Sequence, residues 1–91
     1  MKKYVIERDL PGVGGMNDDE LGGATSKSNA ALAQLSGKVQ WQHSYVAGDK
    51  TFCVYLAESE DEIHKHAELS AIPLAKITEV AQIIHPLTAN N

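Results

Sequence analysis

The stretch Trp41-Gln-His-Ser-Tyr-Val-Ala-Gly-Asp-Lys-Thr-Phe-Cys-Val-Tyr55 decides the fold of this protein. Its residue types alternate with period two on both sides of Gly48-Asp49, a dipeptide typical of tight turns between antiparallel strands. The pattern therefore predicts a β-hairpin, with strands over residues 39–46 and 51–57. The same stretch contains the single Trp, the single Cys and the single Phe of the chain. Candidate functional side chains are thus concentrated in this hairpin.

Two further strands are predicted outside the hairpin. Residues 3–8 are rich in β-forming types and precede the turn residues Asp9-Leu-Pro-Gly, which indicates a first strand. Residues 77–84 have the composition of a last strand, and we expect the chain after His85-Pro86 to be loose. The glycines of residues 12–15 predict a turn, because the Gly-Lys-Ser/Thr ending of a phosphate-binding loop is missing.

Two helices are predicted between these strands. Asn17 and Glu20 have the spacing of a capping box and begin a helix that ends at Ser36-Gly37. Ser59 and Glu62 repeat that spacing before a second helix. This helix has to end before Pro73, since a proline pushes the preceding residue toward extended geometry.

The resulting order β-α-β-β-α-β is the ferredoxin-like plan of the α+β class, in which two helices cover one face of a four-stranded antiparallel sheet. At 91 residues the chain is predicted to be one domain spanning residues 1–91. The plan leaves the second sheet face without helices. We expect that face to be either polar or covered by a partner.

Composition and charge argue against several classes of partner. The net charge is −4 and the eight basic residues are scattered, so no nucleic acid is expected, because binding to phosphates needs clustered Lys and Arg. No apolar run is long enough to predict a membrane span or a signal peptide, so we expect no membrane association and a cytoplasmic location. The lone Cys53 excludes an intrachain disulfide.

The length of the hairpin turn determines which side chains share a sheet face. We favour a three-residue turn, which places one set of hairpin side chains on the face without helices and a second set on the face that packs against the helices. The first set is Trp41, His43, Tyr45, Cys53 and Tyr55, and the second is Val46, Phe52, Val54 and Leu56. A two- or four-residue turn would instead place His43 and Tyr45 with Phe52 and Val54.

The candidate metal ligands are His43, Cys53 and His66. Imidazole and thiolate suit nickel, copper or zinc, and the carboxylates Glu7 or Glu79 would complete a shell. The competing interpretation is structural: Cys53 is then a small buried hydrophobe and His66 a packed, hydrogen-bonded histidine. His64 is expected on the surface, because helix residues two apart cannot chelate one ion.

A second hypothesis is a small-molecule enzyme of the isomerase or cofactor-free oxygenase type. Its pocket would lie on the open sheet face, lined by Tyr45, Tyr55 and His66, and this idea is an analogy at the level of the fold. Glu7 and Glu79 would face each other on neighbouring strands as an acid/base pair.

Several segments together resemble a family of small bacterial ferredoxin-like proteins of unknown function, to which nickel-binding proteins are assigned. The segments are Tyr4-Val-Ile-Glu-Arg8, Pro11-Gly12, Trp41-Gln-His-Ser-Tyr-Val46, Cys53-Val-Tyr55, His66-Ala67, Pro73 and Ile77-Thr-Glu-Val80. The resemblance implies a ferredoxin-like fold, a homodimer, and a site for nickel or another divalent transition metal. Our leading hypothesis is therefore a homodimeric metal-binding protein without turnover.

Overall fold

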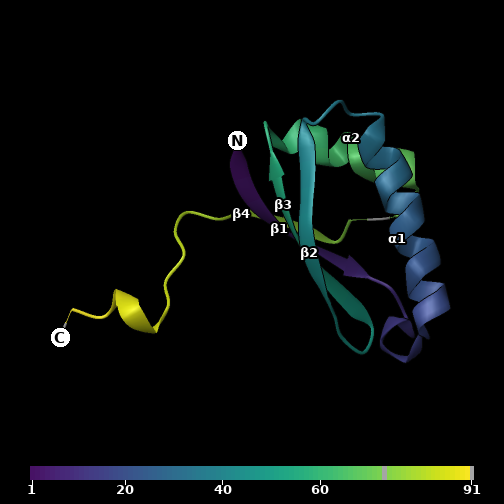
Figure 1. The fold of residues 1–91 in the computed structure, drawn as a ribbon, viewed down its shortest axis with the longest axis horizontal. Helices are drawn as coiled ribbons and strands as arrows, with labels where there is room; N and C mark the ends of the chain where they lie inside the picture. Colours follow the sequence, from purple (N-terminus) through teal and green to yellow (C-terminus); the bar gives the residue numbers. More distant parts are fainter. Residues whose placement is uncertain (73, 91) are drawn as a thin grey trace.

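The computed structural model describes residues 1–72 and 74–90. These residues form a four-stranded antiparallel sheet in the order β2-β3-β1-β4. The strands are β1 (Lys2–Asp9), β2 (Val39–Val46), β3 (Lys50–Ala57) and β4 (Lys76–Glu79). Helices α1 (Asp18–Ala33) and α2 (Glu60–Ser70) lie together on one side of the sheet (Figure 1). The predicted ferredoxin-like α+β fold is confirmed.

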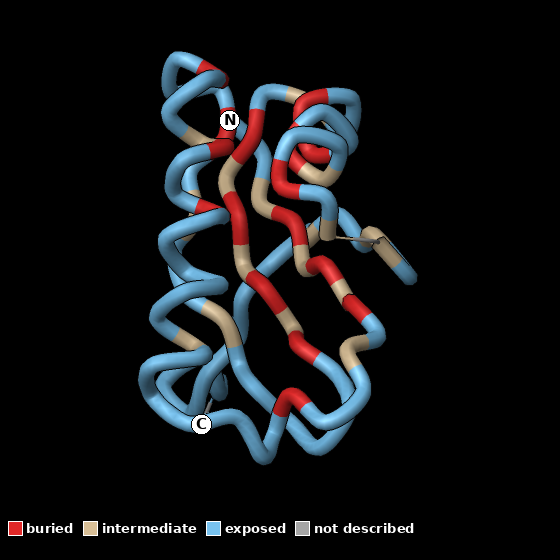
Figure 2. Tube along the Cα trace, turned by 90° about the vertical axis from the view of Figure 1, so that its right-hand side faces the viewer, coloured by how far each residue is buried: buried red, intermediate tan, exposed pale blue. Residues whose placement is uncertain are grey.

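The core lies between the sheet and the two helices. Buried residues alternate with more exposed ones along the strands beneath the helices (Figure 2). Ile6 on β1 and Ile63 on α2 are almost fully enclosed, and Cys53 and Tyr55 of β3 join them in one cluster. Because side chains alternate along a strand, the residues between these positions point to the face without helices.

The two predicted helix starts differ in their hydrogen bonds. Glu20 N donates to Asn17 Oδ1 at 2.9 Å and Asn17 N donates to Glu20 Oε1 at 3.3 Å, so the first capping box is confirmed. Ser59 is the N-cap of α2, but its side chain makes no capping hydrogen bond. Glu62 instead accepts from Lys65 Nζ at 3.2 Å. The end of α2 at Ser70 precedes Pro73, which lies outside the described residues.

The favoured hairpin register is wrong. Ala47 N donates to Lys50 O at 2.9 Å, and Val46 pairs with Thr51, so the turn contains two residues, Gly48 and Asp49. Tyr45 then lies opposite Phe52 and His43 opposite Val54. The helices cover Thr51, Cys53, Tyr55 and Ala57, whereas the expected set Phe52, Val54 and Leu56 faces the other way.

A β-bulge adds a second change of face within β2. Trp41 pairs with Tyr55 and His43 with Val54, so Gln42 is the extra residue. A bulge of this kind re-aims the side chains on its two sides. Trp41 therefore stacks on Tyr55 beneath the helices, with ring centroids 6.4 Å apart, while His43 points to the open face.

The last strand is shorter than predicted. β4 ends at Glu79, and Val80 N donates to Lys3 O at 2.8 Å next to the start of β1. Residues 81–90 make no further backbone hydrogen bond to β1, because that strand begins at Lys2. The chain continues as an extended arm that leaves the body on the side away from the helices (Figure 1). It contains the short 3-10 helix η2 (Pro86–Thr88).

No helix within residues 1–72 and 74–90 combines the length and the apolar character needed to cross a membrane.

Candidate functional site

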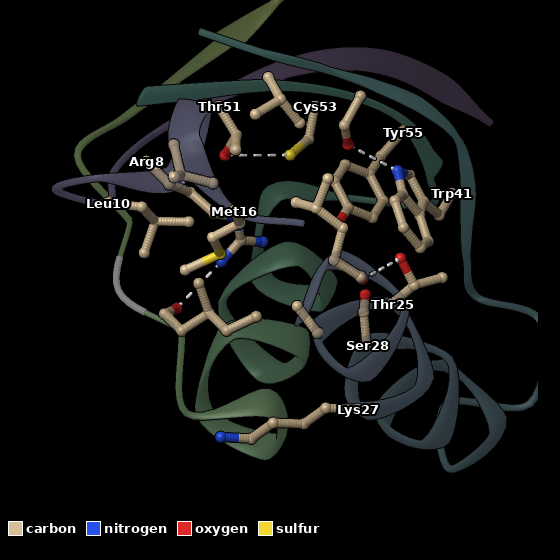
Figure 3. A pocket seen from close by; sticks show the side chains of 16 residues that line it. Arg8, Leu10, Met16, Thr25, Lys27, Ser28, Trp41, Thr51, Cys53 and Tyr55 are labelled. Carbon is tan, nitrogen blue, oxygen red and sulfur yellow. Dashed lines mark hydrogen bonds between the residues drawn. The ribbon is translucent and has the colours of Figure 1, made fainter. Parts of the chain in front are cut away.

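A cavity of about 380 Å³ lies between α1 and the helix-covered face of the sheet. β1, β2 and β3 form its floor, and residues of the turn after β1 close one end (Figure 3). Most of the side chains around it are apolar. They include Val13, Met16, Leu21, Trp41 and Val46.

Arg8 is the unexpected residue at this cavity. It lies on β1 in the same alternation as Tyr4 and Ile6, and it is only 2% exposed. Its Nη1 donates to the backbone oxygen of Ile72 at 3.0 Å, whereas its buried Nη2 has no hydrogen-bond partner among the described residues. Figure 3 shows the side chain reaching inward among the lining residues. A buried guanidinium is costly unless it is paired.

A cluster of buried polar side chains connects α1, α2 and β3 beside the cavity. Ser28 Oγ and His66 Nε2 are hydrogen-bonded at 3.1 Å, and His66 itself is 0% exposed. The Tyr55 ring packs against the imidazole, with centroids 5.3 Å apart. His66 Nδ1 is buried and has no partner within the described part of the chain.

Burial determines the protonation of these groups. It lowers the pKa of His66 below its usual 6.5, and the positive charge of Arg8 lowers it further. It also raises the pKa of Tyr55 above its usual 10.0, although Arg8 offsets part of that shift. Near neutral pH the cluster therefore contains a neutral imidazole, a neutral phenol and one guanidinium cation.

Cys53 lies at the cavity wall. Its Sγ donates to Thr51 Oγ1 at 3.6 Å, and the residue is buried in the core. This placement agrees with the structural interpretation of Cys53 as a small buried side chain.

The open sheet face carries a different set of side chains. The rings of His43 and Tyr45 contact edge to face, with centroids 5.2 Å apart, and both residues are exposed. The pairs Val5–Val54 and Glu7–Phe52 continue this face across β1 and β3. Phe52, Val54 and Leu56 remain partly exposed there.

The structure does not bring the three candidate metal ligands together in one chain. His43 lies on the open face, whereas Cys53 and His66 lie on the helix side of the sheet. Within residues 1–72 and 74–90, no three His, Cys, Asp or Glu side chains are grouped so that they could hold a metal ion. The two-residue turn explains this, because it places His43 on the face opposite to Cys53.

The expected pocket residues are also divided. Tyr55 lines the cavity on the helix side, and Tyr45 lies on the other face. Glu7 faces Lys76 across the strands and lies 3.8 Å from Lys50 Nζ. Glu79 pairs instead with Tyr4 in the ladder and with Lys2 at 3.4 Å. Glu7 and Glu79 therefore form no acid/base pair.

Sequence reasoning missed Arg8 as a core residue. The signal was present, because counting in steps of two from Tyr4 and Ile6 reaches Arg8. A charged residue at the end of such a series is normally assigned to solvent, since Arg is seldom fully buried.

Comparisons with known proteins give one family and one similar fold. A family model described as nickel responsive protein, SCO4226-like, matches residues 4–80. The crystal structure of SCO4226 from Streptomyces coelicolor A3(2) is similar with a TM-score of 0.76 and 14% sequence identity. That match covers 90% of this chain and 99% of the other. No curated protein matches the sequence.

Proposed function

Because the chain belongs to the SCO4226-like family of nickel responsive proteins, we propose that it is a homodimer that binds nickel or another divalent transition metal without turnover. The dimer uses the open sheet face, and the metal binds at that face. The observation that carries the proposal is the apolar character of β3 on the side that no helix covers.

The apolar residues of β3 lie on the side where a single chain leaves them partly exposed. Phe52, Val54 and Leu56 point away from the helices, while the smaller or more polar Thr51, Cys53 and Ala57 are buried beneath them. An apolar patch at the centre of a sheet face is typical of a protein interface. A second copy packed on this face would bury the patch and enlarge the core of a small protein.

His43 is the metal ligand that this arrangement favours. It is exposed on the open face, where it pairs with Val54 of the neighbouring strand. A two-fold dimer brings a second His43 to the same interface. Imidazole nitrogen is a good ligand for nickel, and Glu7 supplies a carboxylate on the same face. Cys53 and His66 remain outside this site.

The C-terminal arm supplies another imidazole. His85 Nδ1 accepts from Leu87 N at 3.2 Å, so the neutral ring carries its proton on Nε2, and Nδ1 becomes a metal ligand by giving up this hydrogen bond. The arm leaves on the side of the open face (Figure 1), so in the dimer it would extend along the second copy.

Calorimetric titration of metal-stripped protein with nickel tests the proposal. We expect saturable binding, and a rise in melting temperature with nickel concentration, because a ligand of the native state alone stabilises it by about 2.7 kcal/mol at about 100 times its Kd. His43→Ala should weaken nickel binding by about tenfold or more. His85→Ala should also weaken it.

His64→Ala is the matched control, because His64 is an exposed histidine on α2, away from the open face. It should bind nickel as the native protein does. Folded protein that binds no divalent ion tighter than millimolar would contradict the metal site. Equal losses of nickel affinity in His43→Ala and His64→Ala would contradict the placement of the metal site on the open sheet face.

A further inference from the structure

We propose that the cavity between α1 and the sheet binds a small organic carboxylate, whose charged end faces Arg8 and whose apolar body fills the space beside Trp41. This site is separate from the metal site, because it lies on the opposite face of the sheet. The proposal rests on the charge, the burial and the shape of the cavity.

The charge of the cavity is the first argument. Arg8 and Lys27 are the charged residues that line it, and both are cations, although the chain as a whole carries a net charge of −4. None of the ion pairs among the described residues includes Arg8. A buried cation without a counter-charge is stabilised by an anion that enters beside it.

The hydrogen bonding of Arg8 limits the kind of anion. One guanidinium nitrogen already donates to Ile72 O at 3.0 Å, and Nη2 is the buried nitrogen left without a partner. One free donor group suits a singly charged carboxylate. A phosphate dianion would place its further oxygens against a wall that is mostly apolar.

The remaining wall argues for an organic ligand. A volume of about 380 Å³ lies within the range of small-molecule sites, which are mostly apolar with a few placed polar groups. Trp41 and Tyr55 provide stacked aromatic surface, and Met16 and Leu21 face them from the turn and α1. A hydrated inorganic ion would leave this apolar surface without contacts.

Binding of benzoate and of benzamide to the native protein, followed by amide NMR shifts in a carboxylate-free buffer, tests the proposal. The two probes share one shape and differ in charge. We expect benzoate to bind saturably, to shift amides of α1 and β3 around the cavity, and to bind at least about tenfold more tightly than benzamide. Inorganic phosphate should not displace it.

Two variants of α1 locate the ligand. Ala24→Trp fills the cavity, because Ala24 lines it, and should abolish benzoate binding. Ala30→Trp adds the same side chain at an exposed position away from the cavity and should leave binding unchanged. Arg8→Gln should reduce benzoate affinity to that of benzamide, and the comparison of the two probes on native protein remains decisive if this variant does not fold.

Equal affinity for benzoate and benzamide would overturn the proposal, because the cavity would then be merely apolar. Absence of binding by benzoate, or benzoate binding that survives Ala24→Trp, would also overturn it. Nickel binding should be unchanged in Ala24→Trp, so failure here is distinguishable from failure of the metal site.

Discussion

Individual polar residues in the core of this protein are held by few hydrogen bonds. His66 is fully buried, yet of its two ring nitrogens only Nε2 has a partner, Ser28, within the described residues. Arg8 lies close enough to His66 to lower the pKa of the imidazole. Burial and this neighbouring cation both oppose protonation of the folded protein at His66.

The stability of the protein should therefore fall in mild acid. In the unfolded chain His66 titrates near its usual pKa of 6.5, whereas in the folded chain its pKa is lower. Below about pH 6.5 the unfolded state binds more protons, so the free energy of unfolding decreases as the pH is lowered. Urea unfolding at about pH 7.5 and about pH 5.5 measures this decrease.

Two histidine variants on α2 separate this effect from other acidic titrations. His66→Gln should be less stable than the native protein by about 1–3 kcal/mol at neutral pH, but should lose less stability on acidification. His64→Gln, at an exposed position, should keep the native pH dependence. If His66→Gln lost as much unfolding free energy on acidification as the native protein does, the acid sensitivity would not come from His66.

At the scale of the elements, the turn after β1 is tied to the hairpin turn by backbone contacts. Gly14 N donates to Gly48 O at 3.0 Å, and Leu10 N donates to Asp49 O at 2.8 Å. A Cβ added at Gly14 would overlap the backbone oxygen of Ala47. Gly14 is therefore needed for close approach of two backbone segments.

Gly14→Ala should destabilise the protein by about 1–3 kcal/mol, because one of the two turns has to move. Gly15→Ala is the matched control, since a Cβ there meets nothing within 4 Å. Chemical unfolding of both variants measures the difference. Equal stability of the two variants would show that the turns separate without cost.

At the scale of the whole molecule, the sheet has one face covered by helices and one face that carries apolar residues without cover. Val5, Phe52, Val54 and Leu56 lie on the second face. The C-terminal arm adds exposed apolar side chains on the same side, with Ile83 66%, Ile84 76% and Leu87 89% exposed. Such an amount of exposed apolar surface is consistent with assembly.

Light scattering after size exclusion tests the proposed dimer. Val54→Asp should convert the dimer to a folded monomer, because a carboxylate buried at the interface without a partner costs several kcal/mol, on the order of 3–5. Ala30→Asp places the same charge on the exposed face of α1 and should stay dimeric. A native protein that is monomeric at micromolar concentration would contradict the proposal, and so would a dimeric Val54→Asp.

The sequence alone was sufficient for the elements and their order. The signals used were period-two alternation, the Gly48-Asp49 turn and the Asn17 capping box. Each of them depends only on residues that are neighbours in the sequence. They predicted the ferredoxin-like fold, which the structure confirms and the similarity to the SCO4226 crystal structure supports. The strand ends at residues 39–46 agree with β2 as observed.

Only the tertiary structure decided which side chains meet. The face of each hairpin residue depends on a turn of two residues and on a bulge at Gln42, and a shift of one residue reverses every side chain of a strand. That reversal separated His43 from Cys53. The burial of Arg8 likewise depends on segments far apart in the chain, such as Ile72, whose backbone oxygen accepts from Arg8 Nη1, and no local pattern encodes that contact.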